Sequence, residues 1–189
     1  LPAHTLTYTF EATQGTVAAT MNGTAVTSGG EIAYDKPAVL KITAKSGYVL
    51  GKLTVDNQVV NLPEGTFDAT TKVTTYAAYT TANLKTAMSI NVEFTAKKTV
   101  SVSASPLSAT RDEIAADKNL PTVTFTPSIS GQKYQFKNAS GTLMDKLPAT
   151  DGVYTIVATS PETADYAALT DESNKFTISQ ANKLSWSVE

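Results

Sequence analysis

The chain has 189 residues, of which 15 are Lys or Arg and 17 are Asp or Glu, giving a formal net charge of −2. This balance leaves no basic field for nucleic acid. The sequence has no Cys, one His (His4) and one Arg (Arg111), which excludes disulfides, cysteine zinc sites, multi-histidine metal sites and arginine-clamped phosphate chemistry. Hydrophobic residues make up 41% of the chain, enough for packed cores. Thr and Ser form roughly a quarter of it, and Thr and Val suit β-strands.

From the pattern of its two ends we expect the chain to be a piece of a longer protein. No segment is long and apolar enough to cross a membrane. The chain opens at Leu1, without an initiator Met or a secretory signal. Leu184, Trp186 and Val188 alternate with Ser up to Glu189. This pattern predicts either a strand that begins where a longer protein was cut, or a terminal strand that pairs with the preceding domain.

The first half of the chain alternates apolar and polar residues with period two, which predicts strands. These are Thr5–Phe10, Val17–Met21, Thr24–Val26, Val39–Ala44, Leu53–Val55, Gln58–Val60, Val73–Tyr79 and Ile90–Phe94. Asn22-Gly23 predicts a tight hairpin, because both central residues of a type I′ turn need positive φ. Asp56-Asn57 predicts a second hairpin. Thr81–Met88 fits either a short helix or a loop.

The second half begins after Lys97-Lys98, which we expect to be a short linker. Arg111–Lys118 predicts a short helical connection, and the other segments predict strands around Val100–Ser103, Val123 and Phe125, Tyr134 and Phe136, Tyr154–Ala158, and Phe176 and Ile178. Short strands separated by Gly and Pro favour small β modules. We therefore predict an all-β protein of two tandem domains, residues 1–97 and 98–181, with 182–189 as a tail or the start of a further module.

Residues 4–96 resemble the divergent internalin-type B-repeat modules of bacterial surface proteins. The frame is an ordered series of short motifs: Gly15-Thr16-Val17, Asn22-Gly23-Thr24, Leu40-Lys41-Ile42-Thr43-Ala44, Gly47-Tyr48, Leu53-Thr54-Val55, then Ile90, Val92 and Phe94. The resemblance implies a small β-rich module of β-grasp-like type. The segment between Asn61 and Met88 is longer than such a repeat needs.

Residues 98–181 resemble the bacterial Ig-like repeats called mucin-binding-type or adhesin-type modules. The motifs are Pro148–Thr159, Ala164-Asp165-Tyr166 and Lys175-Phe176-Thr177-Ile178. The resemblance implies a β-sandwich in which Tyr154 bonds back to the upstream backbone. Ile156 then takes the position of the second Cys, and Val123 or Phe125 fills the gap between the sheets. Tyr134 or Phe136 replaces the core Trp.

Both resemblances imply a secreted or cell-surface bacterial protein whose modules act as a structural spacer or adhesion segment. Two such domains end to end would span roughly 60–80 Å. The expected partners are a host glycan or mucin, or other surface proteins, and we expect a monomer. Most Lys residues fall at turns or on the polar side of strands, so no residue is assigned to a Lys–Asn isopeptide bond. The alternative function is a carbohydrate- or mucin-binding module that uses exposed aromatic side chains.

Three aromatic residues are candidate ligand contacts: Tyr76, Tyr79 and Trp186. Tyr76 and Tyr79 are three residues apart, so they point to opposite faces of a strand and one belongs to the core. Trp186 fits either a sugar contact or the core of a next module.

No group of residues predicts catalysis, a metal site or a cofactor. His4 lies at a terminal strand that we expect to be frayed and solvated, whereas a Ser–His–Asp triad needs a rigidly held His. Asp112-Glu113 and Asp171-Glu172 are expected on the solvated surface, because adjacency in sequence does not set the carboxylate spacing of a glycosidase. Asp165 with the second pair would offer oxygens to Ca²⁺, but the sequence lacks a spaced Asp-x-Asp-x-Asp loop.

Overall fold

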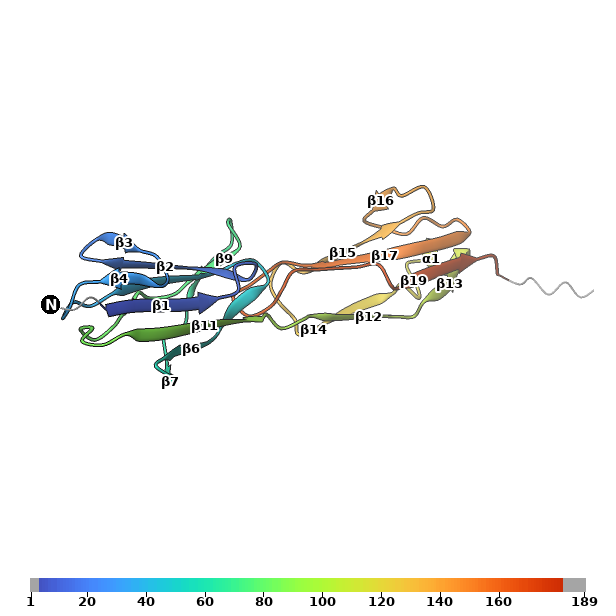
Figure 1. Cartoon of the computed structure of the whole chain (residues 1–189). Coiled ribbons are helices and arrows are strands. Elements are labelled where there is room, and N and C mark those ends of the chain that lie inside the picture. The colour runs from blue at the N-terminus through green and yellow to red at the C-terminus, as the bar shows by residue number, and fades with distance from the viewer. Residues whose placement is uncertain (1–3, 182–189) are drawn as a thin grey trace, which may run out of the picture. The chain divides into compact units, whose positions relative to one another are not determined.

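The computed structural model describes residues 4–181, and its regular secondary structure is almost entirely β-strand (Figure 1). Its one helix in this range, α1, runs only from Arg111 to Ala115. The predicted all-β class is confirmed. The chain divides into two compact units, unit 1 (Leu1–Lys98 with Glu162–Ala167) and unit 2 (Thr99–Pro161 with Ala168–Glu189). The chain therefore returns to unit 1 for six residues that the sequence assigned to the second domain.

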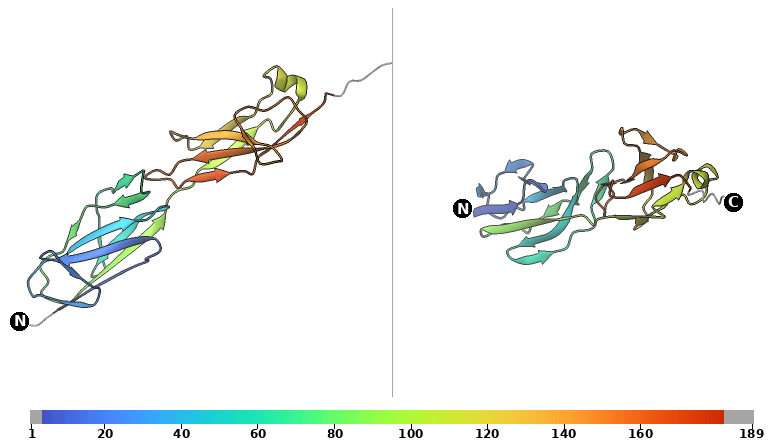
Figure 2. Two further views of the ribbon diagram at one scale, coloured as in Figure 1. Left: turned by 90° about the horizontal axis from the view of Figure 1, so that it is seen from above. Right: turned by 90° about the vertical axis from the view of Figure 1, so that its right-hand side faces the viewer.

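Unit 1 consists of two sheets that enclose an apolar core (Figures 1 and 2). In spatial order, the first sheet contains β4 (Gly30–Ile32), β1 (His4–Phe10), β11 (Met88–Ala96), β6 (Tyr48–Val55) and β7 (Gln58–Val60). The second contains β3 (Thr24–Val26), β2 (Gly15–Met21), β5 (Val39–Ala44), β9 (Val73–Thr75) and β8 (Thr66–Asp68), with β10 (Tyr79–Thr80) also on β5. Strands β1 and β11 pair in parallel, which joins the two ends of this unit's sequence.

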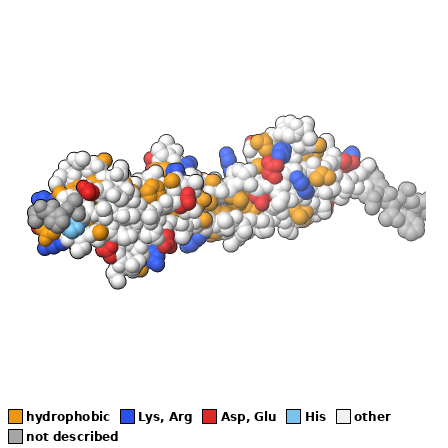
Figure 3. All heavy atoms as spheres, in the orientation of Figure 1, with side chains coloured by type: hydrophobic (Ala, Val, Ile, Leu, Met, Phe, Trp, Pro, Cys, Tyr) orange, Lys and Arg blue, Asp and Glu red, His pale blue; other side chains and the backbone are white. Residues whose placement is uncertain are grey.

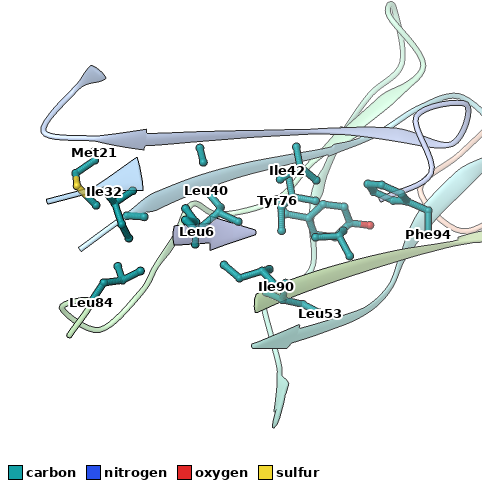
Figure 4. Close-up of a cluster of buried hydrophobic side chains, with 14 of the residues drawn as sticks. Leu6, Met21, Ile32, Leu40, Ile42, Leu53, Tyr76, Leu84, Ile90 and Phe94 are labelled. Atoms are coloured by element: carbon teal, nitrogen blue, oxygen red, sulfur yellow. The ribbon is translucent and has the colours of Figure 1, made fainter. Parts of the chain in front are cut away.

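The core of unit 1 lies between these sheets, as Figure 4 shows. Leu6, Leu40, Ile42 and Ile90 are fully buried. Each comes from the apolar side of an alternating strand, so the period-two pattern supplies the core directly.

Both predicted hairpins of unit 1 are confirmed. Asn22 and Gly23 have φ of 50° and 79°, and they connect β2 to β3 with Met21 opposite Thr24. Asp56 and Asn57, with φ of 47° and 66°, connect β6 to β7 in the same way. Asn and Asp tolerate this left-handed region better than other side chains.

The predicted single strand Val73–Tyr79 is wrong. The structure has two short strands, β9 and β10, on the same neighbour β5. Thr75 lies opposite Thr43, whereas Tyr79 lies opposite Leu40, so the register slips by one residue between them, as at a β-bulge. For residues 81–88 the sequence allowed either a short helix or a loop, and the structure has a loop that leads into β11 at Met88. Leu84 in this loop is buried and forms an isolated β-bridge with Lys36.

Unit 2 has a sandwich-like β arrangement. A two-stranded sheet joins β12 (Ser101–Ser105) to β14 (Thr122–Thr126). The larger sheet contains β13 (Ser108–Thr110), β19 (Lys175–Ser179), β17 (Gly152–Ser160), β15 (Lys133–Lys137) and β16 (Leu143–Met144) in spatial order, with β18 (Leu169–Asp171) on β17. The predicted short helix is confirmed as α1, which Thr110 and Glu113 close with a reciprocal capping box.

The core of unit 2 contains Ile156 and Phe176, which are completely buried, and Phe136, which is 5% exposed. Phe136 lies opposite Ile156 in the sheet, whereas Tyr134 is 41% exposed. Of the two alternatives for the core aromatic position, the structure therefore selects Phe136. The Tyr154 hydroxyl donates to the Thr150 carbonyl at 3.2 Å and shares a 2.7 Å hydrogen bond with the Thr150 hydroxyl. The predicted upstream contact of Tyr154 is confirmed.

No helix among residues 4–181 has the length and apolar character needed to cross a bilayer.

Candidate functional site

A buried ion pair is the most elaborate polar site of unit 1. The Nζ atom of Lys97 lies 2.8 Å from Oε1 of Glu162, and the two side chains are 0% and 4% exposed. Lys97 follows β11 directly, and Glu162 begins the six-residue return of the chain to unit 1. The sequence placed Lys97 in a short linker and gave no reason to expect burial, yet its side chain is enclosed in unit 1.

Three donors converge on the Glu162 carboxylate. Besides Lys97, the Ser46 hydroxyl donates to Oε2 at 2.6 Å and the Gly47 amide donates to Oε1 at 2.8 Å. Desolvation by burial acts to raise the pKa of Glu162, but these hydrogen bonds and the attraction of the Lys97 ammonium together outweigh it. The pKa therefore lies below the ordinary 4.5, and the folded unit favours the charged carboxylate.

The Lys97 ammonium has two further neighbours. It donates to the Thr163 carbonyl at 2.6 Å and lies 4.0 Å from the centroid of the Phe67 ring on β8. A cation over an aromatic face is attracted to the negative π-surface. We call Lys97, Glu162, Ser46, Gly47 and Phe67 the Lys97 cluster.

The backbone around the Lys97 cluster holds the returning segment as well. The Lys98 amide donates to the Asp165 carbonyl, and the Ala167 amide donates to the Lys98 carbonyl, both at 2.9 Å. The Lys97 amide donates to the Gly47 carbonyl at 2.9 Å. Residues 46–47, 97–98 and 162–167 are thus joined by both side-chain and main-chain bonds within unit 1. This arrangement is suited to holding chain segments together.

A cavity of about 320 Å³ lies on the side of unit 1 formed by β6, β7 and the following loop. Leu53, Thr74 and Tyr76 are its buried lining residues, and Ala164 and Asp165 of the returning segment also line it. The Thr74 hydroxyl is buried and has no hydrogen-bond partner among residues 4–181.

The structure separates the three aromatic residues that the sequence singled out. Tyr76 is 8% exposed, and its ring lies among the core side chains of unit 1 (Figure 4). Its hydroxyl accepts a 2.7 Å hydrogen bond from the Leu50 amide. Burial raises the Tyr76 pKa against the opposing effect of that hydrogen bond. Tyr79 is partly buried against the same core, and Trp186 lies outside the described residues.

His4 is not at a frayed, solvated end as expected. It pairs with Ile32 in the sheet, and its ring centroid lies 5.7 Å from that of Tyr34. Its Nε2 atom is buried without a hydrogen-bond partner among the described residues. Pairing of β1 with β4 holds the start of β1 in place. The residues around His4 do not indicate this pairing, because β4 lies more than 20 residues further along the chain.

The acidic pairs have structural contacts. Glu113 closes the capping box of α1, Glu172 pairs with Lys137, and Asp171 caps the turn at Ser173. Within residues 4–181, no group of three or more His, Cys, Asp or Glu side chains is arranged to hold a metal ion.

Sequence reasoning missed the Lys97 cluster. Its members come from four segments that are distant in sequence, and a Lys-Lys pair next to a Thr normally indicates solvated chain. No local signal was available: the alternation of β11 stops at Phe94, since Thr95 and Ala96 are both exposed, and its phase would put Lys97 on the exposed side.

Comparison of the chain with protein-family models, with curated proteins and with solved structures yields no significant match. The function of the chain is therefore inferred from its own residues.

Proposed function

We propose that the chain is a non-enzymatic pair of β modules from a secreted or cell-surface bacterial protein and serves as a structural spacer or adhesion segment. The Lys97 cluster is the observation that carries this proposal. A fully enclosed ion pair with three donors on its carboxylate fixes a chain segment that returns from unit 2 sequence to unit 1. The most elaborate polar chemistry of unit 1 is thus devoted to holding the chain together.

The separate cores support the same role. Unit 1 encloses Leu40, Ile42 and Ile90 completely, and unit 2 encloses Ile156 and Phe176 completely. Each unit is therefore stabilised by its own apolar burial, which suits a module that keeps its fold independently of a ligand. The resemblances to surface-protein modules agree with an extracellular location.

Small-angle scattering of the full chain tests the spacer role. A spacer holds its ends apart, so the expected radius of gyration is clearly above the roughly 16 Å of a single compact body of this length. A value near 16 Å, independent of salt and concentration, would contradict the proposal.

Carbohydrate or mucin recognition through exposed aromatic side chains is the competing function. The burial of Tyr76 weighs against a Tyr76–Tyr79 platform. An array of glycans and mucins, probed with the wild-type chain and with Trp186→Ala, separates the two functions. Specific, saturable binding that the variant loses would favour recognition, whereas background signal from both chains is the result expected of a spacer.

A further inference from the structure

Unit 2 contains an apolar pocket of about 260 Å³, which we call the Tyr134 pocket. Its floor belongs to the core: Ile114, Phe136 and Leu147 are each at most 9% exposed. Leu120 and Tyr134 line it and are 42% and 41% exposed. The volume is just below the roughly 300–1,000 Å³ of pockets for drug-sized ligands, so it suits a single large side chain.

The Tyr134 pocket gathers exposed apolar side chains that are otherwise few among the described residues. Six large apolar side chains among the described residues are substantially exposed, and two of them, Leu120 and Tyr134, line this one pocket. The Tyr134 ring packs edge-to-face on Phe136, with centroids 5.7 Å apart and planes at 82°. Aromatic rings in this arrangement hold each other in place and offer further aromatic contacts. The pocket is therefore preformed by core packing.

The rim of the pocket is acidic on balance. Its charged lining residues are Asp117, Asp145 and Lys146. Asp145 accepts a hydrogen bond from the Gln135 amide at 2.8 Å, whereas the Asp117 carboxylate has no hydrogen bond or ion pair among residues 4–181. Figure 3 shows apolar side chains beside charged ones on the face of unit 2 that it presents. An apolar floor with a free carboxylate at its edge is complementary to an apolar group that carries a positive charge nearby.

We propose that the Tyr134 pocket docks a peptide segment of a partner protein that presents one large apolar side chain next to a Lys or Arg. The apolar side chain fills the pocket against Phe136 and Tyr134, in the manner of a buried anchor residue. The basic side chain then lies near Asp117 and Asp145. This docking role does not depend on the spacer function, because it uses residues of unit 2 alone.

Fluorescence titration tests the proposal with a defined probe. The probe is an end-blocked synthetic peptide with the sequence Gly-Ser-Lys-Trp-Ser-Gly, which places Trp directly next to Lys and does not occur in this chain. The receptor is the full chain carrying Trp186→Ala. The wild-type chain has a single Trp and eight Tyr residues, so excitation at the red edge of the Trp absorption band, where Tyr absorbs little, makes the probe the source of the recorded emission.

We expect saturable binding with a shift of the probe emission to shorter wavelength. Adding Tyr134→Ala to the receptor should weaken binding by about tenfold, as for the loss of an aromatic contact at an anchor site. Reversing the probe charge, with Glu in place of Lys, should weaken binding severalfold. Val153→Thr is the matched receptor control, because Val153 is an exposed apolar residue of unit 2 outside the pocket, and it should leave the affinity unchanged.

Three results would overturn the proposal: no saturable binding, equal binding by the Tyr134→Ala receptor, or equal binding of the charge-reversed probe. Concentration-dependent self-association that Tyr134→Ala abolishes would assign the pocket to a second copy of the chain instead. Thermal unfolding of each variant checks that unit 2 keeps its fold, and the exposure of Tyr134 makes that outcome expected.

Discussion

Unit 1 and unit 2 are both β modules, but they differ in the burial of their ion pairs and in the number of apolar side chains that they expose. Unit 1 encloses an ion pair completely and has Val59 as its one substantially exposed large apolar side chain among the described residues. Unit 2 has ion pairs such as Arg111–Asp151 at its surface, and it exposes Leu107, Leu120, Tyr134, Leu143 and Val153. Both units have a cavity and a surface ion pair, so the difference lies in the enclosed ion pair of unit 1 and in the larger number of exposed apolar side chains of unit 2.

The largest effect on this difference between the units is expected from removing one partner of the buried ion pair in unit 1. Lys97→Met leaves the Glu162 carboxylate enclosed without its counter-charge, and we expect unit 1 to lose about 3–5 kcal/mol of unfolding free energy. The double variant Lys97→Met/Glu162→Leu should regain much of that loss, because replacing both charges by apolar groups removes the uncompensated charge. The unfolding free energy of each unit is measured by urea denaturation, with amide hydrogen exchange as the readout that separates unit 1 from unit 2.

The control for this experiment is Lys98→Met. Lys98 neighbours Lys97 in sequence but has an exposed side chain, so its replacement should change the stability of unit 1 little. Equal losses from the two variants would contradict a special role for the Lys97 cluster.

Truncation of one buried side chain in each unit tests whether the two cores are independent. Ile42 in unit 1 and Ile156 in unit 2 are both completely buried. Ile42→Ala and Ile156→Ala should each cost about 2–5 kcal/mol, from lost transfer energy and the cavity left behind. Each variant should lower the stability of its own unit in amide exchange. A loss shared equally by both units would show that they unfold as one cooperative body.

Acid should weaken the Lys97 cluster of unit 1. The pKa of Glu162 is lowered in the folded unit, so its contribution to stability is fully present above the ordinary value of 4.5 and is lost as pH falls through the lower folded pKa. Glu162→Gln removes this titration. We expect the stability of unit 1 to fall less steeply below pH 4.5 in the variant than in the wild-type chain. Parallel pH profiles would contradict the assignment of the lowered pKa to Glu162.

Local chemistry made much of the fold predictable. The turns at Asn22-Gly23 and Asp56-Asn57 follow from residues that accept positive φ, and α1 follows from Thr110 and Glu113 at capping-box spacing. Tyr154 also reaches a partner only four residues upstream. In each case the residues that determine the feature lie within a few positions of one another.

Contacts between distant segments were not predictable in the same way. The parallel pairing of β1 with β11 joins residues about 80 positions apart, and Lys97 and Glu162 are separated by 65 positions. Neither segment carries a local pattern that names its partner. The Tyr134 pocket was missed for a related reason: Tyr134 and Phe136 lie on the same face of β15, opposite Ala158 and Ile156, so alternation alone does not show that Phe136 is buried and Tyr134 exposed.

The smallest expected effect concerns a single hydroxyl in unit 2. Tyr154→Phe removes the bonds to the Thr150 carbonyl and hydroxyl but keeps the buried ring. We expect a loss of about 1 kcal/mol, the usual net value of a protein hydrogen bond. Tyr134→Phe is the matched control, since the Tyr134 hydroxyl has no hydrogen bond among the described residues and its side chain is exposed. Thermal unfolding compares the two. If Tyr154→Phe proved as harmless as the control, the hydrogen bonds of Tyr154 to Thr150 would contribute nothing measurable to the stability of unit 2, and this polar contact would differ sharply from the buried Lys97–Glu162 pair of unit 1.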